Sequence, residues 1–126
     1  MARGTGNVRR QSGGRGLFAK IVVEAVPSDV RSFKFDIDED LRGIDTHYAS
    51  TIQAAIRLAE EKWLFRLDRN DLARLDVVIK ELVIAPADTT CMAVFYATLL
   101  ALGEALGAEV PDVDVDWSER ELKLKF

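Results

Sequence analysis

The chain has 126 residues, of which 48% are hydrophobic and 30% charged, and its formal net charge at pH 7 is -4. This length suits one domain with its own core, because domains commonly hold roughly 100 to 150 residues. The single cysteine, Cys91, excludes an internal disulfide and a multi-cysteine metal cage. The sequence has neither an apolar run near the ~20 residues of a membrane span nor an apolar signal segment, so we expect a soluble, cytoplasmic domain without a membrane partner.

Charge is distributed unevenly along the chain. All 21 acidic residues follow residue 20. The segment before that point carries only basic charges: Arg3, Arg9, Arg10, Arg15 and Lys20. Five glycines also lie within residues 1–16, and with this composition we expect residues 1–10 to form a flexible basic leader. A basic arm on an acidic body also fits a polyanionic partner, and both interpretations stay open here.

Apolar residues that repeat on one face predict two strands in the first third of the chain, and the second of these alternates cleanly with polar residues. One covers Leu17 to Val26, and the other covers Ser32 to Ile37. Pro27 and the polar residues after it separate the two. Since the connection is short, we expect these strands to pair as a hairpin.

A helix, a strand and a second helix follow. Asp45 or Thr46 can cap a helix that runs to about Trp63, with apolar residues spaced by three and four. Leu75–Ile84 reads as a third strand, which Pro86 ends. Asp88 or Thr89 can cap a second helix, which covers Thr90–Leu106 and ends at Gly107. This helix is apolar nearly all round, which favours burial in the core over coverage by a partner.

The C-terminal residues 108–126 contain two short alternating segments. Val113–Trp117 alternates with aspartates, and Leu122–Phe126 alternates with charged residues, so the two should form a hairpin. The whole order is then β-β-α-β-α-β-β. This order predicts an α+β fold with two helices on one face of a mainly antiparallel sheet.

The sequence contains no convincing catalytic constellation. There is no P-loop, and Gly13-Gly14-Arg15-Gly16 opens onto a strand where phosphate-binding loops open onto a helix. His47 is the only histidine, and no second histidine or cysteine is placed to join it, so a helix-capping or surface role is favoured. Cys91 has no base near it in sequence, so we expect an ordinary half-buried cysteine. Asp112, Asp114 and Asp116 lack the spacing of a calcium loop. We therefore expect no enzyme, no cofactor, no metal and no nucleotide bound by this chain alone.

Two segments of the sequence, Gln11–Phe18 and Asp88–Ala93, resemble domain IV of bacterial elongation factor G. Gln11-Ser12-Gly13-Gly14-Arg15-Gly16 with the aromatic Phe18 is similar to the family's opening signature, although Leu17 replaces the usual glutamine. Asp88-Thr89-Thr90 and Met92-Ala93, before an alanine-rich helix, are similar to its Asp-Ser-Ser-x-Met-Ala segment. Residues 11–107 would form this domain. The resemblance implies the ribosomal protein S5 domain 2-like fold, with an unusual left-handed βαβ crossover.

The resemblance also implies candidate contacts. Tip loops of the family domain enter the decoding region of the small ribosomal subunit, and the matching positions here are Leu41, Arg42, Gly43, Pro86 and Asp88. Basic residues beside the glycine signature are candidate contacts to RNA or the ribosome: Arg9, Arg10, Gln11, Arg15 and Lys20. The expected function is thus a noncatalytic, ribosome- or RNA-associated module in translation.

Other functions stay open. Four carboxylates within residues 36–40 would repel phosphates at the expected tip, and the loop before the second helix is short. These departures favour the alternative, a protein-interaction or assembly domain that kept the fold and works as a homodimer or with a protein partner. Related folds also occur in small-molecule kinases, for which Cys91 and His47 would be the last catalytic candidates. Finally, the family has an additional strand before the glycine signature, for which this chain looks too short, so we expect Glu121–Phe126 to fill that edge of the sheet.

Overall fold

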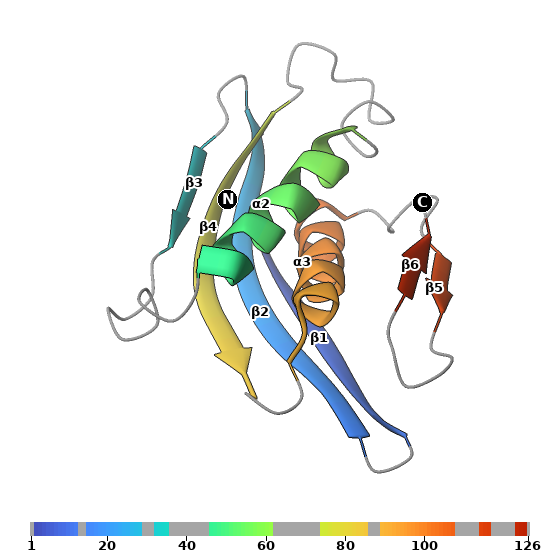
Figure 1. Ribbon diagram of the computed structural model, residues 1–126. Helices are drawn as coiled ribbons and strands as arrows, with labels where there is room; N and C mark the ends of the chain where they lie inside the picture. Colours follow the sequence, from blue (N-terminus) through green and yellow to red (C-terminus); the bar gives the residue numbers. More distant parts are fainter. Residues whose placement is uncertain are drawn as a thin grey trace.

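A mixed four-stranded sheet with two helices on one face forms the body of the protein (Figure 1). The computed structural model describes residues 2–12, 15–28, 32–35, 46–61, 74–85, 89–107, 114–116 and 123–125. In spatial order the strands are β1 (Ala2–Ser12), β2 (Arg15–Ser28), β4 (Arg74–Ile84) and β3 (Ser32–Phe35). The helices are α2 (Thr46–Ala59) and α3 (Cys91–Leu106). This α+β arrangement fits the expected S5 domain 2-like fold.

The N-terminal residues form a strand, so the expected flexible leader is wrong. β1 pairs antiparallel with β2 along its whole length, from Ala2 opposite Ala25 to Ser12 opposite Arg15. The glycines that suggested disorder serve packing instead. Gly4 and Gly6 are buried against α3, where no larger residue fits. β1 is therefore the edge strand for which the chain had looked too short.

β3 does not pair with β2, so the expected hairpin of these two strands is wrong. β2 is bordered by β1 on one side and by β4 on the other, which leaves it no free edge for β3. β3 instead pairs in parallel with β4, with Phe33 opposite Val77. In Figure 1 both strands run downward, β3 lies to the left of β4, and α2 crosses in front of the sheet. The connection from β3 through α2 to β4 is therefore a left-handed crossover, as the resemblance implied.

β4 carries a bulge opposite β2. Val22 pairs with Glu81, but the next residue, Val23, pairs with Ile79, so Lys80 is an extra residue on β4. The apolar spacing of the strand changes at this point, because Ile79 and Leu82 are both buried although three positions separate them. The bulge keeps both residues on the side of the helices.

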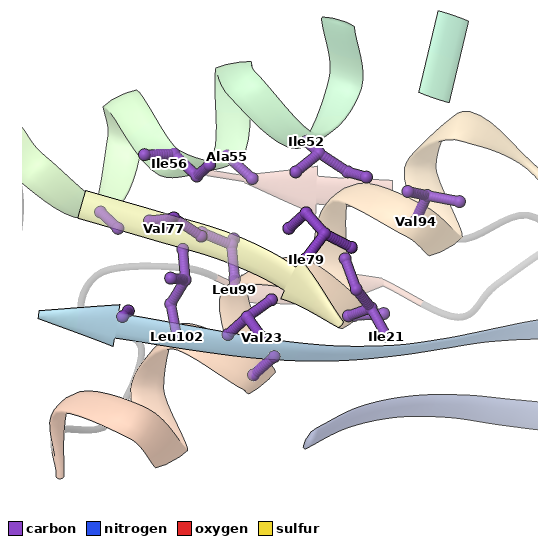
Figure 2. Close-up of a cluster of buried hydrophobic side chains, with 14 of the residues drawn as sticks. Ile21, Val23, Ile52, Ala55, Ile56, Val77, Ile79, Val94, Leu99 and Leu102 are labelled. Atoms are coloured by element: carbon purple, nitrogen blue, oxygen red, sulfur yellow. The ribbon is translucent and has the colours of Figure 1, made fainter. Parts of the chain in front are cut away.

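The hydrophobic core lies between the helices and the sheet (Figure 2). α2 contributes Ile52, Ala55 and Ile56, and they point toward Val77 and Ile79 on β4. α3 lies over β1 and β2 and also packs against α2. Its burial confirms that the apolar helix belongs to the core.

Both ends of α3 have regular caps. Thr90, and neither Asp88 nor Thr89, is the N-cap, and its hydroxyl accepts a hydrogen bond from the Ala93 backbone N–H at 3.0 Å. At the other end Gly107 adopts φ 69°, in the left-handed region that favours glycine. The expected stop at Gly107 is confirmed.

The C-terminal strands pair with each other. β5 (Asp114–Asp116) and β6 (Lys123–Lys125) are antiparallel, with Val115 opposite Leu124, as the predicted hairpin requires. They form a sheet of their own, and β6 lies beside α3. The expectation that the tail completes the main sheet is therefore wrong, because β1 already occupies that edge. Among the described helices, none has the length and apolar character needed to cross a membrane.

Candidate nucleic-acid interface

The hairpin of β1 and β2 reaches beyond the rest of the sheet. β4 ends at Ile84, which lies opposite Ala19 on β2. β1 and β2 stay paired past that point, from Arg9 opposite Phe18 to Ser12 opposite Arg15. Figure 1 shows this pair of strands projecting below the end of β4. We call residues 9–12 and 15–18 the basic ribbon.

The basic ribbon carries three arginines and no acidic residue. Arg9 and Arg10 lie on β1, and Arg15 lies at the start of β2. The Arg9 side chain is exposed, and no carboxylate of the described residues forms an ion pair with it. The first acidic residue of β2 is Glu24, about six positions after Phe18, where the ribbon ends. The ribbon is thus a locally cationic projection of an acidic protein.

The other two N-terminal cations have acidic partners on the sheet. Arg3 donates a hydrogen bond to Glu24, with 2.9 Å between Nη2 and Oε1, and this contact lowers the pKa of the Glu24 carboxyl. Lys20 lies 3.6 Å from Glu81 on β4. Both pairs are partly exposed to solvent, so each stabilises the fold only weakly. Of the expected RNA contacts, Lys20 is therefore partly neutralised, whereas Arg9 is not.

Thr89 ties the base of the ribbon to the segment before α3. Its hydroxyl donates to the Phe18 carbonyl oxygen at 2.6 Å and accepts from the Ala85 N–H at 2.8 Å. The Thr89 N–H also donates to the Ala85 carbonyl oxygen at 2.8 Å. The two segments that carry the family resemblance, around Phe18 and around Thr89, therefore meet in space. This role is not visible in the sequence, where Thr89 reads only as a candidate helix cap.

The described residues settle the position of only part of the expected site. Arg10, Gln11 and Arg15 lie in the paired backbone of the ribbon. The expected tip positions lie outside the described residues: Leu41, Arg42, Gly43, Pro86 and Asp88. His47 lies in the first turn of α2, and Cys91, expected to be half-buried, is exposed in the first turn of α3. Over the part of the chain that is described, no three potential ligand side chains gather as a metal site would require.

Comparisons with known proteins support the fold and leave the function open. No protein-family model and no curated protein matches the chain. A crystal structure of a protein from Thermus thermophilus is similar, with a TM-score of 0.68 and 21% sequence identity. The match covers 86% of this chain and 16% of the Thermus protein, so this chain spans about a sixth of that protein's length. At this identity the similarity concerns the fold alone.

Proposed function

We propose that the protein is a noncatalytic module that binds RNA, as part of the ribosome or free, through its basic ribbon. The observation that carries this proposal is the projection of Arg9, Arg10 and Arg15 beyond the end of β4 with no acidic residue on the ribbon. The resemblance to elongation factor G domain IV supports the same role, because the ribbon contains the Gln11–Gly16 signature. The proposal covers RNA binding and assigns no reaction to the chain.

The electrostatics of the whole protein favour a local site over a diffuse one. The net charge of -4 repels a polyanion from most of the surface, so any attraction has to come from a cationic projection. A two-stranded ribbon can bring its charges to a phosphate backbone while the acidic body stays several ångströms behind. Held by paired backbone and by Thr89, the ribbon loses little conformational freedom on binding.

Salt dependence tests the proposal. If three arginines each neutralise one phosphate of single-stranded RNA, log K should fall with log[salt] at a slope of about -2, taking ~0.7 per contact. Substituting Arg9, Arg10 and Arg15 together by glutamine should bring the slope close to zero and abolish co-sedimentation with ribosomes at low salt. The matched control is Arg57→Gln, which removes one exposed charge at the C-terminal end of α2 and should leave the slope unchanged.

Two results would contradict the proposal. One is wild-type protein that binds neither ribosomes nor RNA at about 50 mM salt, where phosphate contacts are strong. The other is binding whose salt slope is the same in the triple variant as in the wild type. Either result would favour the alternative, a protein-interaction domain, which predicts a partner or a stable oligomer that is insensitive to the three arginines.

A further inference from the structure

We propose that Phe18 is a stacking platform for an unpaired nucleotide base on the sheet face opposite the helices. This inference rests on the proposed RNA binding and names the form of RNA that the site prefers. Phe18 lies at the base of the basic ribbon, in the last pair of residues before β4 joins the sheet at Ala19 and Ile84.

Strand alternation places Phe18 on the face of the sheet that neither described helix covers, which we call the open face. Ala19 and Ile21 lie on the face of β2 that packs under the helices, and both are fully buried. Phe18 lies on the opposite face of the strand and is half-buried. It does not pack against the hydrophobic core cluster, whereas Phe33, Phe95 and other aromatic residues do. The phenyl ring is therefore partly accessible to a ligand.

The residues around Phe18 are of the types that bind single-stranded RNA. Arg9 lies directly opposite Phe18 in the β1–β2 register, and its exposed guanidinium can reach a phosphate or stack on a base. Lys20 lies two residues along β2 on the same face, with exposed Asn7 opposite it on β1 and exposed Val83 opposite it on β4. We call these five residues the open-face patch: one aromatic ring, two cations, one amide and one aliphatic side chain. Glu81 on β4 lies 3.6 Å from Lys20 and partly neutralises it, so Arg9 is the cation of the patch that has no carboxylate partner among the described residues.

The backbone of Phe18 is held in place from three sides. Arg9 pairs with it on β1, the adjacent Ala19 pairs with Ile84 on β4, and Thr89 donates a hydrogen bond to its carbonyl oxygen at 2.6 Å. An aromatic ring mounted on a fixed backbone binds with little loss of conformational entropy. The Thr89 contact thereby gains a second role, since it fixes the platform as well as the ribbon.

The chemistry of stacking selects unpaired bases. In a duplex, neighbouring base pairs already cover both faces of every base, so a ring on a sheet can stack only on a base that is splayed out. Arg9, by contrast, can contact phosphates of either form. The open-face patch should therefore bind a single strand more tightly than the same strand in a duplex.

Fluorescence anisotropy with a labelled eight-nucleotide RNA, single-stranded or annealed to its complement, tests this. We expect Phe18→Leu, which keeps an apolar side chain but removes the ring, to weaken single-strand binding by about 5- to 100-fold. Its salt slope should equal that of the wild type, because no charge is lost. Phe18→Tyr keeps the ring and should bind like the wild type. Phe18→Trp should lose indole fluorescence when RNA is added, measured against the wild-type signal of Trp63 and Trp117.

The outcomes separate this inference from the proposed function. If Phe18→Leu binds as tightly as the wild type while the triple arginine variant loses its salt slope, the stacking platform is wrong and the basic ribbon stands. Equal affinity for single strand and duplex, or an unquenched Phe18→Trp, would likewise overturn the platform alone. A wild-type protein without any salt-dependent RNA binding would overturn both.

Discussion

Gly6 on β1 lies so close to α3 that a Cβ atom at this position would overlap the carbonyl oxygen of Ala97. Gly4, two residues earlier, stands in the same relation to Ala101, one helical turn later. Two strand residues span about 6.7 Å and four helix residues about 6 Å, so the two spacings match. The strand and the helix therefore run past each other in direct backbone contact, and α3 holds β1 in the sheet.

Replacing Gly6 by alanine should destabilise the protein severely. The new methyl group meets backbone atoms that cannot move aside without displacing β1 or α3, so we expect a loss of about 3 kcal/mol or more in the free energy of unfolding, measured by urea denaturation. Asn7→Ala, at the exposed neighbouring position, is the matched control and should change stability by less than ~0.5 kcal/mol. A Gly6→Ala protein as stable as the wild type would show that β1 does not pack on α3.

Removing the hydroxyl of Thr89 should loosen the basic ribbon. Thr89→Val keeps the shape of the side chain but leaves the Ala85 N–H and the Phe18 carbonyl oxygen without this partner. We expect a loss of about 1–3 kcal/mol in the free energy of unfolding and faster amide hydrogen exchange near Phe18. Thr89→Ser retains the hydroxyl and should restore slow exchange. If Thr89→Val exchanges as slowly as the wild type, the hydroxyl does not anchor the ribbon.

Glu60 should be important for joining α2 to β4. Its side chain is only 4% exposed, and its Oε2 accepts a hydrogen bond from the Leu75 backbone N–H at 2.9 Å. Glu60→Leu leaves this buried N–H without the acceptor and should lower the free energy of unfolding by about 1–3 kcal/mol, whereas Glu60→Gln keeps an acceptor oxygen and should cost less. Glu61→Leu, at the exposed next residue, is the control in thermal denaturation. Equal effects at the two positions would contradict a specific role for Glu60.

The elements with a clear hydrophobic period were predictable from sequence. β2, β4 and both helices lie close to their expected bounds, because apolar residues repeat on one side of each. β1 was missed because its inward positions are Gly4, Gly6 and Val8, and two glycines in a row of three hide the alternation. The signal that could have found it is the matching series of small residues on α3: Ala97, Ala101 and Ala105.

Pairing and contacts between distant segments were harder to predict. The expected hairpin of β2 with β3 followed from their short connection, but the true partner of β3 is β4, which comes some forty residues later in the chain. For the candidate interface, the basic residues could be read from the sequence. The sequence could not show that Lys20 is paired while Arg9 has no carboxylate partner among the described residues, because the pairing depends on Glu81 across the sheet. The anchor between Thr89 and Phe18 joins residues 71 positions apart.

The pair of Arg3 and Glu24 gives the protein a pH dependence whose direction is fixed. The hydrogen bond from Arg3 is the main cause that lowers the pKa of Glu24 below its ordinary value of 4.5. A carboxyl whose pKa is lower in the folded state stabilises the protein above its unfolded pKa, and this contribution is lost as the pH falls through the folded pKa.

Arg3→Gln should therefore raise the pKa of Glu24 toward 4.5, measured by NMR titration of its side-chain carboxyl carbon. The difference in stability between wild type and Arg3→Gln should be constant above about pH 5 and shrink steadily below it. Because the pair is exposed, the difference should be small and should decrease further with added salt. An unchanged Glu24 titration in Arg3→Gln would show that Arg3 does not form this contact in solution.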